Sequence, residues 1–241
     1  MSQPAKRASW LARRLAPAGA AAGQRVEQQI DAATQAFFER RIADAERLFT
    51  AAVRDAEGYG PLDARLATAL VNLAEFYRVQ GEFNQAEPHY WRAITIDEQA
   101  FGPEHLHVAR DLNNLALLYR AQGRYAEAQP LCERALEIKQ RLLGPEHPSV
   151  TGSLSNLLTV YLAQGNYTEA EPLYRRMLAL KAKALGPDHP EFANSLSNYA
   201  ALLRKTKGET EAAQIEAEAE ALRTRLDQPA NGRVRAAAPR R

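Results

Sequence analysis

The sequence predicts an all-α fold, an α-solenoid of about five antiparallel helix pairs. Gly-Pro pairs begin at residues 60, 102, 144 and 186, each 42 residues after the last. The triplets GEF, GRY and GNY begin at Gly81, Gly123 and Gly165 with the same spacing. Between these marks apolar residues recur at steps of three and four, which is the period of an amphipathic helix. Internal repeats at such a fixed period are the signature of solenoid architectures.

Each repeat is expected to hold two helices joined by a tight turn. In the unit 102–143 one apolar helical stripe runs up to Gly123 and a second follows it. Gly123 suits the left-handed residue that ends a helix and allows a tight turn. The pair Gly144-Pro145 ends the second helix, because proline cannot continue it and glycine takes a positive φ without cost.

Three clear repeats are flanked by two degenerate ones. The segment 40–53 matches 81–94, with the turn glycine replaced by Arg40, and the last unit shifts its glycine by one position to Gly208. Terminal repeats of solenoids commonly lose their pattern because one face meets water. The repeat domain is predicted over residues 24–226, in units of about 24–59, 60–101, 102–143, 144–185 and 186–226.

The charge is concentrated at the two ends of the chain. The net charge is +2, with +5 in residues 1–25 and +3 in residues 227–241, which leaves −6 for the body. We expect residues 1–23 and 227–241 to be basic, disordered segments. The alternative for the N-terminal segment is a short Arg-rich helix that contacts anionic lipid or nucleic acid.

No apolar run approaches the ~20 residues that a membrane-spanning helix needs. Arg13 and Arg14 interrupt the only stretch that resembles an export signal. Cys132 is the single cysteine and cannot form an internal disulfide. We therefore expect a cytoplasmic protein.

The repeats resemble the tetratricopeptide type, in the long form found in kinesin light chains and related bacterial proteins. The matching residues are Leu112, Asn114, Leu115, Ala116, Tyr119, Gly123, Tyr125, Ala128 and Leu136, followed by LGPEHP. The resemblance covers about four fifths of the chain. It implies a right-handed superhelix whose first helices line a concave groove that binds peptides or protein segments. Cys132 stands where other units have tyrosine and is expected to pack in the core.

The histidines beside carboxylates raise the question of a metal site. His105, His147 and His189 hold one position in successive repeats, so stacked helices should separate them by ~8–10 Å or more. Zinc needs its ligands within ~2.0–2.3 Å of one point. The second unit has Asp63 at this place, and Asp is a favoured N-cap. We interpret these histidines as helix N-caps, and predict neither a metal nor a cofactor.

Catalytic motifs are absent. The sequence has no GxSxG, HExxH, GxxxxGK[ST] or GxGxxG. The Glu-Ala pairs recur with the repeat, which argues against paired carboxylates for acid/base catalysis. The prediction is a protein that is not an enzyme.

An asparagine recurs in four units, at Asn72, Asn114, Asn156 and Asn198. Asn is unfavourable inside a helix, so its recurrence needs a reason. Two interpretations stay open: a hydrogen bond between repeats that fixes their stacking, or an amide ladder that bonds a peptide backbone in the groove. Residues one helical turn away should share that face. The predicted groove residues are Asn72, Arg78, Arg110, Asn113, Asn114, Leu117, Arg120, Ser155, Asn156, Thr159, Asn194, Ser197, Asn198, Arg204 and Lys205.

The groove set carries five cations, which predicts a surface more positive than the acidic body. Since arginine recognises carboxylates through its bidentate fork, an acidic partner peptide is expected. The other interpretation is that these arginines are solvated helix ends. The sequence thus predicts a non-enzymatic scaffold for protein–protein interaction. The alternative is an adaptor whose basic ends bind membrane or nucleic acid while the repeats recruit a protein.

Overall fold

The computed structural model describes residues 24–186 and 188–227. The predictions for the basic segments 1–23 and 227–241 lie outside this part of the chain, except that Asp227 belongs to the last helix and not to a disordered tail. The described residues form helices and turns, without a strand, which confirms the all-α prediction. The helices are α2 (Gln24–Phe38), α3 (Ile42–Glu57), α4 (Ala64–Gln80), α5 (Phe83–Phe101), α6 (Leu106–Ala121), α7 (Tyr125–Leu143), α8 (Pro148–Gln164), α9 (Tyr167–Leu185), α10 (Pro190–Thr206) and α11 (Glu209–Asp227).

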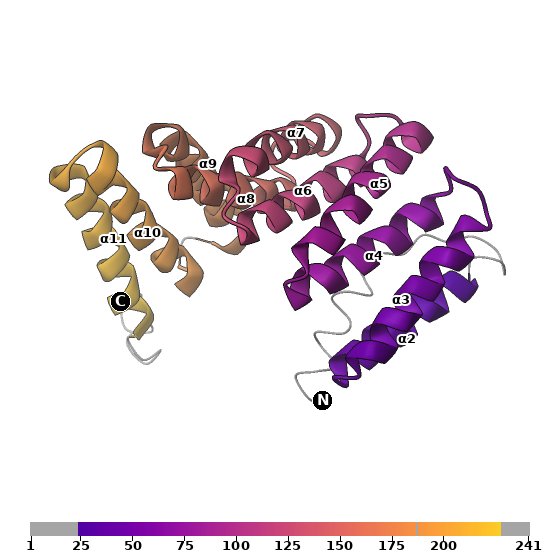
Figure 1. The fold of residues 1–241 in the computed structure, drawn as a ribbon. Helices are drawn as coiled ribbons and strands as arrows, with labels where there is room; N and C mark the ends of the chain where they lie inside the picture. The colour runs from indigo at the N-terminus through magenta and orange to yellow at the C-terminus, as the bar shows by residue number, and fades with distance from the viewer. Residues whose placement is uncertain (1–23, 187, 228–241) are drawn as a thin grey trace, which may run out of the picture. The chain divides into compact units, whose positions relative to one another are not determined.

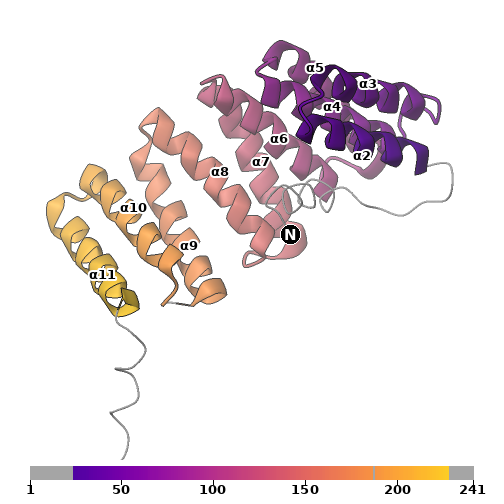
Figure 2. The same cartoon turned by 90° about the horizontal axis from the view of Figure 1, so that it is seen from below.

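The helices form two compact units, which meet in sequence at Gly144 and Pro145. The first unit contains α2 to α7 and the second contains α8 to α11. Within each unit every helix packs against its neighbours in the chain, and the members of a pair run antiparallel (Figure 1, Figure 2).

The turn inside each repeat has the backbone conformation that its glycine predicts. Gly81, Gly123 and Gly165 have φ angles of 81°, 73° and 77°, in the left-handed region. Arg40, which replaces the glycine in the first repeat, keeps this conformation with a φ of 61°. The turn geometry is therefore retained even where the residue type that favours it is missing.

Where one repeat follows another, a side chain caps the N-terminus of the next helix. The side chains of His105, His147 and His189 accept hydrogen bonds from backbone N–H groups two residues later, at 3.1 to 3.2 Å. Asp63 does the same for Arg65 at 2.9 Å. These bonds satisfy N–H groups that the first turn of a helix leaves unpaired. The interpretation of the histidines as helix caps is confirmed.

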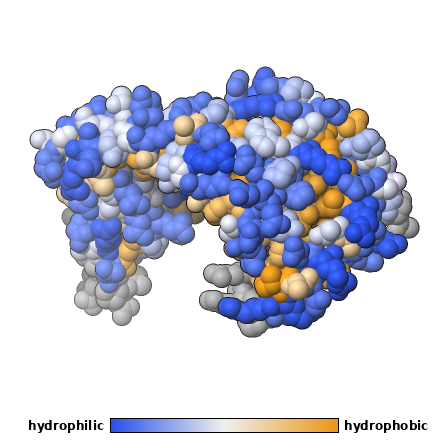
Figure 3. All heavy atoms as spheres, viewed as in Figure 1, coloured by the Kyte–Doolittle hydropathy of each residue, from blue (hydrophilic) through white to orange (hydrophobic). Residues whose placement is uncertain are grey.

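The core consists of apolar residues on the facing sides of the helices, with many alanines. Leu66, Leu115 and Leu154 are fully buried. Cys132 is also fully buried, as expected for a packing residue, and burial raises the pKa of its thiol to about 11. On the face drawn in Figure 3, hydrophilic residues cover much of the surface and hydrophobic ones reach it in patches.

Candidate functional site

The second unit contains a cavity of about 460 Å³ between α8, α9 and α10. Its apolar wall includes Leu158 from α8, Met177 from α9 and Leu202 from α10. Two lysines also line it, Lys181 on α9 and Lys205 on α10. The cavity therefore combines apolar contact with positive charge.

The two lysines differ in their surroundings. Lys181 is half-buried, and its ammonium group donates to the Ser195 hydroxyl at 3.0 Å. The Ser195 hydroxyl donates in turn to the backbone carbonyl oxygen of Glu191 at 2.9 Å. Lys205 is exposed and has no ion-pair partner within the described part of the chain. Because an ammonium group has three donors, both lysines can meet an anionic group of a ligand.

Tyr174 and Asn198 connect α9 to α10 at the cavity wall. Burial raises the pKa of Tyr174, and the hydrogen bond from Asn198 partly opposes that rise. The Tyr174 ring also stacks on Tyr199, with ring centroids 5.5 Å apart. Asn198 thus joins two repeats and lines the cavity at once, so the two interpretations of this asparagine are compatible here.

Four of the predicted groove residues line the cavity: Ser155, Thr159, Asn198 and Lys205. The other predicted residues of this unit, Asn156, Asn194, Ser197 and Arg204, are not part of its lining. Arg204 lies 3.3 Å from Glu209 and 3.8 Å from Glu216. The Ser197 hydroxyl donates to Glu216 at 2.8 Å. These two side chains connect α10 to α11 instead.

In the first unit, two predicted groove arginines are paired with acids of the chain. Arg78 donates to both carboxylate oxygens of Glu75, at 2.8 and 2.6 Å. Arg110 lies 2.7 Å from Asp111 and 3.3 Å from Asp97. Their charges are compensated within the chain, so the count of cations in the sequence overstates the positive charge that these two offer a ligand.

The amides of the first unit are held in their own helices. Asn72 is buried and donates to the carbonyl oxygen of Thr68 at 2.8 Å. Asn113 is buried and donates to the carbonyl oxygen of Ala109 at 3.0 Å. The remaining predicted residues, Asn114, Leu117 and Arg120, are half-buried on α6. The recurrent asparagines therefore do not share one environment.

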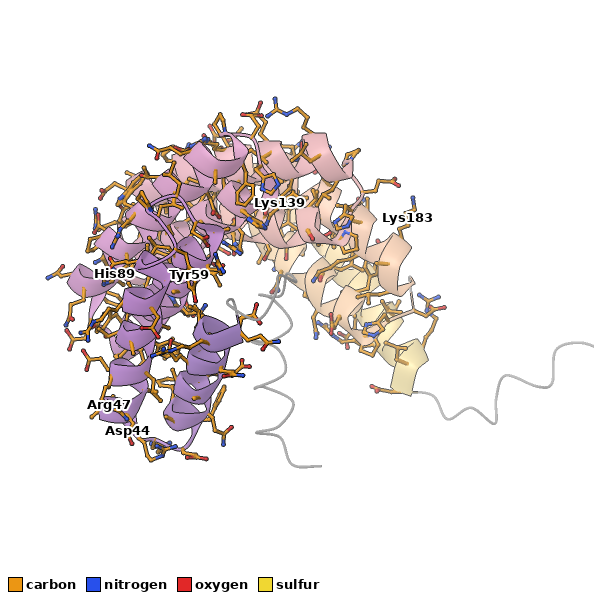
Figure 4. All side chains as sticks on the ribbon, turned by 90° about the vertical axis from the view of Figure 1, so that its right-hand side faces the viewer. Asp44, Arg47, Tyr59, His89, Lys139 and Lys183 are labelled. Atoms are coloured by element: carbon orange, nitrogen blue, oxygen red, sulfur yellow. The ribbon has the colours of Figure 1, made fainter. Side chains whose placement is uncertain are left out.

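The contribution of α9, the second helix of its repeat, was not predicted from the sequence. Lys181 and Met177 of α9 line the cavity, whereas every predicted groove residue lies on a first helix. The signal lay in the repeat itself: Asp97, Lys139 and Lys181 hold one position, 42 residues apart. Lys139 is labelled in Figure 4. A change from acid to base at this position marks where the repeats differ chemically.

In residues 24–186 and 188–227, no group of three or more His, Cys, Asp or Glu side chains could hold a metal ion. None of the helices found there is long and apolar enough to cross a bilayer.

The chain is a helical repeat scaffold. It consists of antiparallel helix pairs at a fixed repeat, and side chains from three of its helices line a cavity. The profile of the tetratricopeptide repeat family matches residues 65–129, 112–183 and 152–225. These matches span more than half of the chain, which therefore belongs to the tetratricopeptide repeat family. No curated protein matches the chain in sequence.

Solved structures of kinesin light chain-like repeats have the same fold. BtubC (BKLC) from P. vanneervenii is 25% identical, with a TM-score of 0.75 over 98% of this chain and 92% of that one. A Podosopora anserina structure, described as kinesin light chain with nearly identical TPR-like repeats, is 24% identical, with a TM-score of 0.74 over 86% of this chain and 99% of that one. The resemblance to the kinesin light chain type is confirmed at the level of fold.

Proposed function

We propose that the chain is a cytoplasmic, non-enzymatic interaction module that holds an acidic peptide segment of a partner protein in the cavity of the second unit. Tetratricopeptide repeat scaffolds generally act in protein interaction and are typically not enzymes. The observation that carries the acidic partner is the pair Lys181 and Lys205 beside an apolar wall.

The chemistry of the cavity favours an amphipathic segment. Leu158, Met177 and Leu202 can bury an apolar side chain of the ligand. A carboxylate next to that side chain would meet the two lysines, and charge-assisted hydrogen bonds are shorter and stronger than neutral ones. A peptide with a hydrophobic residue flanked by Asp or Glu satisfies both requirements.

Neutral polar groups at the same wall suit a peptide backbone. Ser155, Thr159 and Asn198 line the cavity with hydroxyl and amide groups that both donate and accept. The hydroxyl of Thr159 donates to the carbonyl oxygen of Ser155 at 2.8 Å, and its lone pairs stay available to a peptide N–H group. These side chains can therefore orient a bound strand of peptide without selecting its sequence.

The proposal is tested with labelled peptide libraries and fluorescence anisotropy. One library is enriched in Asp and Glu around a central Leu or Phe, and the matched library carries Asn and Gln instead. We expect the wild-type chain to bind the acidic library at least about tenfold more tightly. This corresponds to only ~1.4 kcal/mol of binding free energy, which the two lysines can supply. Substituting Lys181→Ala and Lys205→Ala together should remove this preference.

Lys183 supplies the matched control on α9. It lies outside the cavity, pairs with Glu146 and is labelled in Figure 4. Lys183→Ala lowers the net charge by the same amount as each test substitution. Equal binding of the two libraries by the wild-type chain, or an equal loss in Lys183→Ala, would contradict a specific acidic site.

A further inference from the structure

Two aspartates face each other in the interior of the first unit, where α5 packs on α6. Asp97 of α5 and Asp111 of α6 are both fully buried. The two carboxyl groups lie within hydrogen-bonding reach of each other. Taking a single carboxylate out of water is costly, so two in contact require compensation.

Arg110 provides one positive charge for the pair. Its guanidinium lies 2.7 Å from Asp111 and 3.3 Å from Asp97. His107 lies 3.7 Å from Asp97, but burial, together with Arg110 and His105, lowers the pKa of its imidazole to about 4. The imidazole is therefore neutral near pH 7, and the pair keeps one uncompensated negative charge.

The other helices that pack against α5 and α6 in this unit are α4 and α7. Among the described residues, no charged group of α4 or α7 shifts the pKa of either aspartate. On α4, Arg65 pairs with Asp63, and Glu75 pairs with Arg78. On α7, Arg134 pairs with Glu98 of α5. The net charge around the two carboxyl groups is therefore set by Asp97, Asp111, Arg110 and His107, with His105 as the neighbour of His107.

The hydrogen bonds of the pair are also incomplete. Asp97 Oδ1 and Asp111 Oδ2 are buried and have no hydrogen-bond partner within the described part of the chain. An ionised carboxylate only accepts hydrogen bonds, whereas a protonated one also donates. One proton held by the pair would turn two facing acceptors into a donor and an acceptor, and would cancel the excess charge.

The equivalent contact in the second unit, between α9 and α10, has different residues. A shift of 84 residues, two repeats, relates Asp97 to Lys181 and Asp111 to Ser195. There the contact between α9 and α10 is an ammonium group that donates to a hydroxyl at 3.0 Å. The repeat architecture therefore does not require two acids at this place, and the acid pair is a property of the first unit.

We propose that the Asp97–Asp111 pair is a proton-dependent joint, which holds one shared proton when α5 and α6 are packed and loosens their packing when that proton is lost. Protonated, the pair forms a carboxyl–carboxylate hydrogen bond beside Arg110. Deprotonated, two carboxylates in the interior repel each other and share one guanidinium. The stacking of the second repeat on the third then responds to pH near neutrality.

The titration of Asp97 gives the sign and the range of this response. Burial, and then the charge of Asp111, raise the pKa of Asp97 from 3.8 to about 7. At pH values between these two pKa values, the packed state retains a proton that the open or unfolded state has lost. The stability of the joint therefore falls as the pH rises from about 4 to about 7, and the full loss is present above that.

The test compares Asp97→Asn with the wild-type chain by amide hydrogen exchange at pH 5 and pH 8. The asparagine amide donates to Asp111 at every pH and so replaces the proton. We expect amides of α5 and α6 to exchange more slowly in the variant than in the wild-type chain. The ratio of the two rates should grow by at least about tenfold between pH 5 and pH 8.

Asp31→Asn, an exposed aspartate on α2 of the same unit, is the matched control and should leave the ratio near one at both pH values. A ratio for Asp97→Asn that does not change with pH would overturn the proposal. So would a wild-type chain in which millimolar Ca²⁺ or Mg²⁺ slows exchange at pH 8, since the pair would then hold a cation.

A second measurement does not depend on a variant. In the wild-type chain, the ¹³C signal of the Asp97 carboxyl should titrate with a midpoint near pH 7. A midpoint near the ordinary value for an aspartate, about 4, would show that Asp97 is an ordinary carboxylate and would refute the shared proton.

Discussion

Arg40 adopts the left-handed conformation that glycine takes in the turns of the other repeats. Its φ of 61° lies in the left-handed region, which a side chain with a Cβ atom disfavours by ~1–2 kcal/mol. The turn is held by backbone hydrogen bonds from Arg40 N to Phe37 O at 3.0 Å and from Arg41 N to Ala36 O at 2.9 Å. These bonds and the packing of α2 on α3 hold Arg40 in its strained backbone conformation.

Replacing Arg40 by glycine should therefore stabilise the first unit. We expect Arg40→Gly to raise the free energy of unfolding by about 0.5–1 kcal/mol, because the relief of strain exceeds the entropy that glycine gains in the unfolded chain. Chemical denaturation measures the change. Arg54→Gly, at an exposed position inside α3, is the control and should lower the stability by about 1 kcal/mol. A loss of stability in Arg40→Gly would show that the arginine side chain itself holds the turn.

At the scale of helices, neighbouring repeats of the first unit are joined by polar contacts as well as by the core. Glu87 of α5 accepts a hydrogen bond from the Tyr119 hydroxyl of α6 at 2.7 Å and one from Arg124 at 2.7 Å. Arg124 also lies over the Tyr119 ring, 4.0 Å from its centroid. The hydroxyl of Tyr119 further accepts from the Trp91 indole at 3.2 Å. One carboxylate thus fixes α5, α6 and the start of α7 together.

Removing this carboxylate should weaken the stacking of α5 on α6. We expect Glu87→Ala to lower the free energy of unfolding by about 1–3 kcal/mol, since it leaves the buried Tyr119 hydroxyl without its acceptor. Arg124 keeps its ion pair with Glu127. Denaturant titration measures the loss, and Glu137→Ala at an exposed site on α7 is the control. A change as small as that of the control would mean that water replaces the carboxylate without loss.

The same contact has a pH dependence opposite to that of the buried aspartates. The hydrogen bond from Arg124, and then that from Tyr119, lower the pKa of Glu87 below its ordinary value of 4.5 against the effect of burial. A depressed carboxyl pKa stabilises the fold above the ordinary value, and this contribution is lost as the pH falls through the lowered one. The difference between Glu87→Ala and the wild-type chain should therefore shrink below about pH 4.

For the whole molecule, the sequence predicted the fold well because the repeat encodes it locally. Turn glycines, Gly-Pro stops and the His147 cap act within a few residues, so their spacing is enough to place the helices. The charge that the predicted groove residues offer a ligand was harder to predict, because it depends on contacts between side chains. Arg78 and Glu75 are three residues apart, so their pairing could have been anticipated on a helix. The contacts of Arg110 with Asp97 and of Lys181 with Ser195 join different helices and required the structure.

The division into two compact units makes a prediction about cooperativity. Repeat proteins gain stability from each repeat and from its interfaces with direct neighbours, so damage should remain local. Leu66 of α4 and Leu203 of α10 are both buried, one in each unit. Each Leu→Ala substitution should cost about 2–5 kcal/mol where it occurs. By hydrogen exchange we expect Leu66→Ala to speed exchange mainly in α4 and α5, and Leu203→Ala mainly in α9 to α11. Equal acceleration across both units in both variants would show instead that the chain unfolds as one cooperative body.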